Sequence, residues 1–202
     1  MAIQKSHLTR FSVPLHLKPH IVGFTKLSTQ MSPTELVELL NQIFSRFDQL
    51  AEHYGLEKIK TIGDAYMVVA GLPQQRVDHA RSIADMAMTM QQTILIFNEE
   101  AGHNLKMRMG IHTGPVIAGV IGLRKFCYDL WGDTVNTASR MESHGLPDEI
   151  QVTRVTYECL KLQYLFEERG CIFIKGKGEM TTYLLKAKRK PENSGFVAKM
   201  AG

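Results

Sequence analysis

A long amphipathic helix followed at once by a β-hairpin is the sequence feature that most constrains the fold. Ser32-Pro33-Thr34-Glu35 forms a capping box with proline at the first helical position, and apolar residues keep helical spacing until Gly55. Strand-like segments then run from 56 to 62 and from 65 to 70, on either side of a Gly63-Asp64 turn. Helices and antiparallel strands of this kind bury their apolar faces against each other. The sequence therefore predicts an α+β fold with helices packed on a sheet.

The rest of the chain continues this mixture of helices and strands. Further helices are expected at residues 77–97, 134–142 and 155–162. Further strands are expected at 105–112, 116–121, 125–130, 150–153, 171–175 and 182–185. Residues 1–20 form an atypical N-terminal segment, and residues 186–202, rich in Lys, Arg, Pro, Gly and Ser, predict a flexible tail. We therefore expect one folded domain over residues 21–185.

Composition excludes several classes of protein. The 202 residues are 44% hydrophobic and 22% charged, which fits a single globular domain. The net charge of +4 falls well short of a nucleic-acid-binding stripe but suits an anionic small substrate. Three cysteines without CxxC spacing favour a reduced protein of the cytoplasm. No stretch reaches about 18 consecutive apolar residues, so neither direct membrane insertion nor a nucleic-acid partner is expected.

Five segments are too particular to be generic. They are Ile21-Val22-Gly23-Phe24-Thr25, residues 58–67 (KIKTIGDAYM), residues 110–116 (GIHTGPV), residues 128–142 (YDLWGDTVNTASRME) and residues 175–178 (KGKG). Together and in this order they resemble the catalytic domain of class III adenylyl and guanylyl cyclases, over residues 21–185. The resemblance implies a ferredoxin-like βααββαβ core that works as a head-to-tail homodimer, with both subunits supplying residues to each site.

Asp64 is the first candidate metal ligand. A carboxylate in a tight turn can project from a sheet edge and supply the oxygen that a hard cation such as Mg²⁺ needs, although aspartate is also common in turns for local reasons. The resemblance implies that Asp64 and the backbone carbonyl of Ile21 hold two divalent cations per site, Mg²⁺ or Mn²⁺. It also implies that Gly23, Phe24 and Thr25 offer backbone amides to phosphate oxygens, as a helix N-terminus favours.

Lys60 and Asp129 lie at the two positions with which the family reads the base. Adenine offers N1 as an acceptor and N6 as a donor, so a site for adenine needs one donor and one acceptor. Lysine donates to N1 and aspartate accepts from N6, whereas guanylyl cyclases typically have glutamate and cysteine at these positions. Cys127 stands two residues away from the second position and does not replace it. The pair predicts ATP as the substrate.

Asn136 and Arg140 are spaced i, i+4, so they share one face of a helix. The resemblance implies that Asn136 orients the ribose, that Arg140 stabilises charge on the phosphates in the transition state, and that Lys175 contacts the terminal phosphates. A planar guanidinium suits phosphate oxygens better than an ammonium does. Lys177 is interpreted as a solvated neighbour and His112 as a structural residue.

The chain departs from the family pattern at His20, where the family has its first metal-binding aspartate. Histidine favours softer transition metals over Mg²⁺. Lys18 and Pro19 are also unfavourable in a central strand, which predicts a damaged first strand.

Three functional readings follow. The leading one is an adenylyl cyclase, a phosphorus–oxygen lyase of signal transduction, which converts ATP into 3′,5′-cyclic AMP and pyrophosphate by a two-metal mechanism at a dimer interface. The alternative is a catalytically impaired, cyclase-like module for nucleotide binding or dimerisation, because the first metal aspartate is replaced by His20. A guanylyl cyclase is disfavoured by Lys60 and Asp129.

Overall fold

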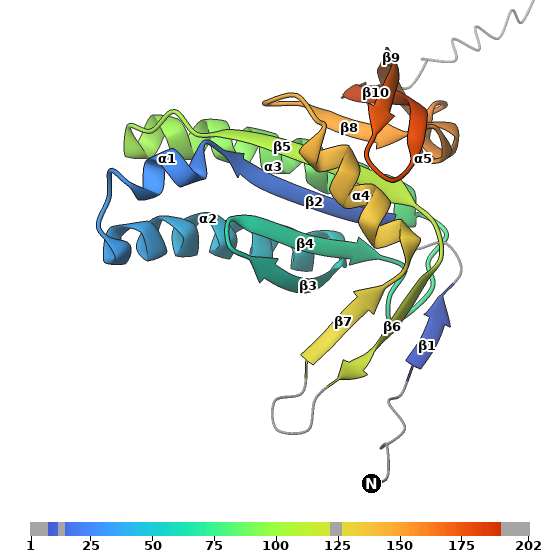
Figure 1. Cartoon of the computed structure of the whole chain (residues 1–202), viewed down its shortest axis with the longest axis horizontal. Helices are drawn as coiled ribbons and strands as arrows, with labels where there is room; N and C mark the ends of the chain where they lie inside the picture. Colours follow the sequence, from blue (N-terminus) through green and yellow to red (C-terminus); the bar gives the residue numbers. More distant parts are fainter. Residues whose placement is uncertain (1–7, 12–14, 122–126, 191–202) are drawn as a thin grey trace, which may run out of the picture.

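A computed structural model of the chain describes residues 8–11, 15–121 and 127–190 (Figure 1). Its centre is a seven-stranded mixed sheet with the strand order β3-β4-β2-β5-β8-β10-β9. The strands are β2 (Leu15–Val22), β3 (Glu57–Ile62), β4 (Ala65–Ala70), β5 (Lys106–Thr113), β8 (Ile150–Thr153), β9 (Tyr164–Ile174) and β10 (Gly178–Lys188).

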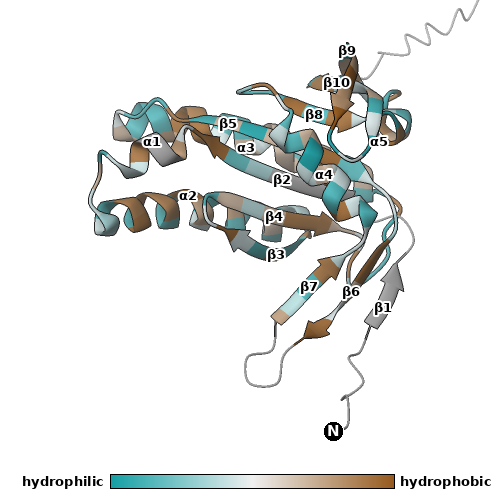
Figure 2. Ribbon diagram, viewed as in Figure 1, coloured by the Kyte–Doolittle hydropathy of each residue, from teal (hydrophilic) through white to brown (hydrophobic). Residues whose placement is uncertain are grey.

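The helices cover both faces of this sheet. They are α1 (Phe24–Ser28), α2 (Pro33–Tyr54), α3 (His79–Ala101), α4 (Asp133–Ser143) and α5 (Arg154–Leu160). The order β2-α1-α2-β3-β4-α3-β5 confirms the predicted βααββαβ core. Helices α2 and α3 pack on one face through the main apolar core, whereas the largely hydrophilic α4 lies on the opposite face (Figures 1 and 2). None of the described helices is long and apolar enough to cross a membrane.

Helix α2 begins and ends where the sequence predicts. The hydroxyl of Ser32 accepts a hydrogen bond from the Glu35 amide, the Glu35 carboxylate accepts one from the Ser32 amide, and Gly55 ends the helix in a left-handed conformation. Its buried face, which includes Leu39, Ile43 and Phe47, packs into the main core. Local capping and apolar spacing together therefore fix this helix on the sheet.

The expectation of a damaged first strand is wrong. Strand β2 occupies the middle of the sheet, between β4 and β5, and pairs with β5 without a break from Leu15 to Val22. Its register with β4, in contrast, has no paired residues at Lys18 and Pro19. Proline has no N–H to donate to a neighbouring strand. The interruption in pairing around Pro19 is therefore confined to the side of β2 that faces β4. Burial of Pro19 and Ile21 in the layered core holds the strand in place.

A second, three-stranded sheet packs beside β3 and β4. It has the order β1-β6-β7 and consists of β1 (Leu8–Phe11), β6 (Val116–Ile121) and β7 (Cys127–Trp131). A small apolar cluster joins the two sheets through Met67 and Val69 of β4 and Leu130 of β7. This packing brings β7 next to β3.

Several expected boundaries differ from the structure; α3, for example, runs from His79 to Ala101 and not over residues 77–97. The last two strands are longer than the sequence pattern indicates, and β10 continues to Lys188 as part of the sheet, so residues 186–188 do not belong to a tail. In β9 and β10, exposed and buried side chains do not alternate regularly, so the sequence pattern does not reveal the full length of these strands. Residues 189 and 190 follow β10 without regular secondary structure. The predicted tail from residue 191 onward lies outside the described residues, as do residues 125 and 126 of the expected strand 125–130.

Gly110 brings α4 directly onto the sheet. A Cβ atom at Gly110 would lie 2.1 Å from the backbone nitrogen of Glu142 and 2.5 Å from the carbonyl oxygen of Ala138. Only glycine permits this contact, because any side chain would overlap the backbone of the helix. At Gly110, helix α4 therefore touches the backbone of β5 directly.

Candidate active site

His20 and Asp64 meet where β2 approaches the turn between β3 and β4. His20 lies opposite Ala65 in the sheet, and Gly63, with φ 58°, makes the turn that presents Asp64. His20 Nε2 is 3.0 Å from Asp64 Oδ2. The contact lacks the geometry of a hydrogen bond, and Asp64 Oδ2 is buried without a hydrogen-bond partner among the described residues. A buried carboxylate oxygen without a hydrogen bond is costly, and here the ion-pair contact with His20 is the only interaction that the described residues give this oxygen.

The other ring nitrogen of His20 faces a charged pair that the sequence analysis missed. Glu142 of α4, with a side chain only 4% exposed, accepts a hydrogen bond of 3.0 Å from Arg108 of β5. Glu142 Oε1 is also 3.8 Å from His20 Nδ1. Arg108 stands opposite His20 across the β2–β5 ladder and two residues before Gly110, so it shares the face that meets α4. Because side chains in a strand point alternately to its two faces, the two-residue spacing from Arg108 to Gly110 is the sequence signal that could have indicated the Arg108–Glu142 pair.

The described side chains do not fit two Mg²⁺ ions. In the described part of the chain, no three acidic, histidine or cysteine side chains come together in a group that could hold a metal. Asp64 supplies one carboxylate, and the charge of Glu142 is already balanced by Arg108. Mg²⁺ takes oxygen ligands in near-ideal octahedral geometry, whereas His20 offers nitrogen. Ile21, next to His20, is buried in β2, and the role of its carbonyl as a ligand stays a prediction.

Lys60 of β3 and Asp129 of β7 form a direct ion pair, although 69 residues separate them. Packing of β7 against β3 brings them together. Asp129 Oδ1 also accepts a hydrogen bond of 2.8 Å from the Leu130 amide, which fixes the orientation of the carboxylate. Both side chains are accessible, at 33% and 17% exposure. The structure thus places one donor and one acceptor side by side.

Helix α4 carries Asn136 and Arg140 one turn apart, as the spacing predicts. Asn136 is exposed and Arg140 is half-buried. Among the residues that the structure describes, neither side chain has a hydrogen bond or an ion pair. Both are therefore available to a ligand that approaches this face of the helix.

The turn between β9 and β10 holds Lys175 and Lys177. Lys175 is exposed, whereas Lys177 is half-buried and forms an ion pair with Asp133, the first residue of α4. The interpretation of Lys177 as a solvated neighbour is therefore wrong, because this pair ties the turn to the helix that carries Asn136 and Arg140.

Gly23 lies between β2 and α1, with φ 77°, and its carbonyl accepts a hydrogen bond of 3.0 Å from Leu27. Phe24 and Thr25 begin α1. The position at the start of a helical turn agrees with the expectation of free amides for phosphate, but that role of the three residues stays a prediction.

His112 has the structural surroundings that the sequence analysis expected. Its Nδ1 is 2.8 Å from the hydroxyl of Thr153, and burial lowers its pKa to about 4; nearby Asp133 raises this pKa and Lys177 lowers it. The imidazole is therefore neutral in the folded protein at neutral pH.

The pKa of His112 predicts an acid-sensitive fold. Because the unfolded chain binds the proton more readily, the free energy of unfolding should fall as the pH drops from about 6.5 towards 4, by up to about 3 kcal/mol. His112→Gln should remove this part of the pH dependence. Urea unfolding between pH 4 and 8 measures it, and equal slopes in both proteins would contradict the prediction.

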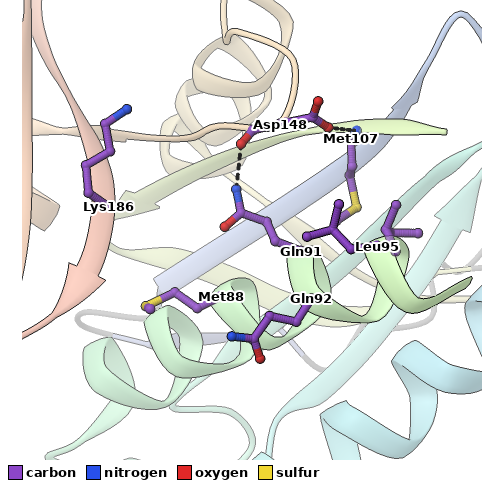
Figure 3. A pocket seen from close by; sticks show the side chains of 8 residues that line it. Met88, Gln91, Gln92, Leu95, Met107, Asp148 and Lys186 are labelled. Carbon is purple, nitrogen blue, oxygen red and sulfur yellow. Dashed lines mark hydrogen bonds between the residues drawn. The ribbon is translucent and has the colours of Figure 1, made fainter. Parts of the chain in front are cut away.

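The site residues fall into separate groups within one chain. In the described part of the molecule, neither a hydrogen bond nor an ion pair joins the His20–Asp64 pair to the Lys60–Asp129 pair, or either pair to Arg140 or Lys175. A hollow of about 270 Å³ between α3, β5 and β10 (Figure 3) is lined by Met88, Gln91, Gln92, Ile94, Leu95, Met107, Asp148 and Lys186, none of them a predicted site residue.

Comparisons with known proteins identify the family of the chain. The model of the adenylate and guanylate cyclase catalytic domain matches residues 18–187. An adenylate cyclase of Mycobacterium tuberculosis is 45% identical over 88% of the chain, and a membrane guanylyl cyclase of Dictyostelium discoideum is 47% identical over 83%. The chain spans only 40% and 11% of the length of these two relatives.

The fold is also that of solved cyclase domains. The guanylate cyclase domain of RhGC from Catenaria anguillulae, solved in complex with GTP, superimposes with a TM-score of 0.87 at 34% identity, and the match covers 90% of this chain and 100% of that one. Sequence motifs, topology and three-dimensional similarity agree. The chain belongs to the adenylate and guanylate cyclase catalytic domain family.

Proposed function

We propose that the chain is the catalytic domain of an adenylyl cyclase and converts ATP into 3′,5′-cyclic AMP and pyrophosphate. The observation that carries the proposal is the ion pair between Lys60 and Asp129. Relatives that make either cyclic nucleotide are about equally similar to the chain, so overall similarity does not decide the base. The choice depends on the chemistry of these two side chains.

The pair suits adenine and not guanine. An ammonium can donate to adenine N1, and a carboxylate can accept from N6. Guanine would place its N1–H against the ammonium and its O6 against the carboxylate, and each unsatisfied polar group would cost roughly 1–3 kcal/mol. With no base bound, Lys60 and Asp129 pair with each other, so each side chain already lies where it would contact the base.

A complete site requires two chains. Arg140 can bind phosphate oxygens through two N–H groups, Asn136 can hydrogen-bond the ribose, and Lys175 can contact the terminal phosphates. Since no hydrogen bond or ion pair joins these residues to Asp64 among the described residues, we propose that a head-to-tail homodimer brings the groups together at each site. ATP is the expected partner of that interface.

Base selection gives the direct test. We expect the double variant Lys60→Glu, Asp129→Cys to raise the ratio of GTP to ATP kcat/KM by at least about 30-fold, since two hydrogen bonds change from favouring adenine to favouring guanine. Initial rates with each nucleotide measure the ratio. Lys58→Glu is the matched control: Lys58 is exposed on the same strand and pairs with Asp48 at 2.7 Å. An unchanged ratio in a double variant with a normal melting curve would contradict the assignment.

A second candidate function has its own observation. His20 occupies the position of a metal carboxylate, and Arg108 holds the neighbouring Glu142, which favours a domain that binds ATP without turning it over. Cyclic AMP formation and ATP binding, measured on the same preparation, separate the two functions.

A further inference from the structure

We propose that a basic hollow at one edge of the central sheet docks the domain on a membrane surface that carries anionic phospholipids. The hollow has a volume of about 910 Å³ and lies between the first turn of α3, the end of α5, the start of β9 and the end of β10. The contact is peripheral, at the level of the lipid headgroups. It does not depend on the proposed function.

The hollow collects positive charge. Five of its eight lining residues are basic and none is acidic, and the five are Arg81, Lys161, Lys188, Arg189 and Lys190. Among the described residues, two carboxylates, Asp85 and Glu158, form ion pairs with this group. The basic hollow therefore keeps an excess of positive charge, although the whole chain has a net charge of only +4.

Arg189 holds its guanidinium in a fixed place at this hollow. Its Nε donates hydrogen bonds to the carbonyl oxygens of Lys161, at 3.2 Å, and Tyr164, at 3.1 Å. Its backbone amide also donates to the carbonyl of Gln163, at 2.8 Å. The described part of the chain gives its two terminal nitrogens no partner, so they are available to the oxygens of a phosphate group.

Two leucines beside these cations are exposed to water. Leu162 is 84% exposed and Leu165 is 43% exposed, and both line the basic hollow. Cations next to apolar side chains suit the boundary of a bilayer, where the cations meet lipid phosphates and the apolar groups leave water. A small soluble anion would engage the cations and leave the leucines exposed.

The composition of the hollow favours lipid over an acidic protein. Protein interfaces are enriched in aromatic residues and depleted in lysine, whereas three of the five basic residues here are lysines and none of the eight lining residues is aromatic. Lysines are flexible point charges, and lipids in a fluid bilayer can move to meet each of them. A protein partner would have to match their positions.

The basic hollow is also separate from the candidate active site. Strand β9 forms one edge of the seven-stranded sheet, and β3, which carries Lys60, forms the other (Figure 1). Within the β9–β10 hairpin, Lys188 pairs with Tyr164 at one end, and Lys175 lies in the turn at the opposite end. A membrane at the hollow therefore leaves the base-reading pair uncovered.

Sedimentation with vesicles in about 0.1 M salt tests the proposal on the whole chain. We expect at least about tenfold stronger binding to phosphatidylcholine vesicles with about 30% phosphatidylserine than to pure phosphatidylcholine. Each Lys or Arg at such a surface contributes about fivefold in affinity, so Arg189→Gln, Lys190→Gln should weaken binding by at least about tenfold. Leu162→Gln should weaken it by at least about threefold, because an apolar contact is lost.

Lys58→Gln, Lys106→Gln is the matched control, which removes the same charge from two exposed lysines elsewhere. Lys58 lies on β3, and Lys106 follows the far end of α3 from Arg81. Binding to acidic vesicles should fall by less than about threefold in this variant. If the melting curve of Arg189→Gln, Lys190→Gln is altered, Lys161→Gln, Lys190→Gln takes its place, because it leaves the side chain of Arg189 and its hydrogen bonds intact.

Several results would overturn the proposal. They are equal binding to acidic and neutral vesicles, equal losses in the hollow and control variants, or unchanged binding in Leu162→Gln. Binding of soluble pyrophosphate or of polyglutamate at the hollow, without binding to acidic vesicles, would assign it instead to a small anion or to an acidic protein. None of these readouts involves a nucleotide or turnover, so failure of this proposal is distinguishable from failure of the proposed function.

Discussion

Mixing the Asp64→Ala chain with the Arg140→Ala chain is expected to restore cyclic AMP synthesis that neither variant shows alone. Each single variant should lose at least about 100-fold in rate, because it removes charge stabilisation from both sites of its dimer. In a mixed dimer, one site receives both substitutions and the other receives neither. Since half of the dimers in an equal mixture are mixed, activity should return to about a quarter of the wild-type value.

The double variant Asp64→Ala, Arg140→Ala is the control for this experiment. When it is mixed with either single variant, every site in every dimer carries a substitution, so no activity should return. Subunit exchange is followed separately, by energy transfer between labelled chains. If exchange occurs and the two single variants still do not complement each other, the sites lie within one chain and the proposed dimer is wrong.

His20→Asp should raise the Mg²⁺-dependent rate of cyclic AMP synthesis by about 100-fold, with a smaller gain in Mn²⁺. A carboxylate at this position would give Mg²⁺ the oxygen ligands that it prefers, next to Asp64. Binding of ATP should change much less, because Lys60, Asp129 and Arg140 are not altered. Rates in each metal and ATP affinity, measured on both proteins, check the expectation.

The exposed residue His53 supplies the matched substitution, His53→Asp, which adds the same charge away from the site. It should leave the rate in Mg²⁺ unchanged. A wild-type chain that is already as active in Mg²⁺ as His20→Asp would refute the prediction and would imply that another carboxylate completes the metal site.

The parts of the fold that could be predicted are those with local causes. The capping box at Ser32 and the left-handed Gly55 determine α2 through contacts within a few residues, and the Gly63-Asp64 turn determines the β3–β4 hairpin in the same way. Strand β2 could not be predicted, because the cost of Pro19 depends on which side of the strand loses its pairing. Which side loses its pairing depends on the order of the strands in the assembled sheet, and no local sequence pattern reveals that order.

The candidate site shows the same division. Asn136 and Arg140 share a helix face by their spacing alone, and the resemblance supplied Lys60 and Asp129. The pair between Arg108 and Glu142 joins residues 34 positions apart through the packing of α4 on β5, and the pair between Lys177 and Asp133 joins a turn to a helix 44 positions away. No local pattern encodes these distances, so the residues that orient the site were missed.

The contact at Gly110 has a mechanical consequence. Helix α4 carries Asn136 and Arg140, and the strand beneath it pairs with the strand that carries His20. Because backbone touches backbone at Gly110, we expect the C-terminal turn of α4 to move together with β5. Arg140 on α4 and His20 on β2 are therefore expected to keep a constant position relative to each other within one chain. In the proposed dimer, we therefore expect closure around a nucleotide to involve rotation of one subunit against the other, and a regulatory signal could act by changing that rotation.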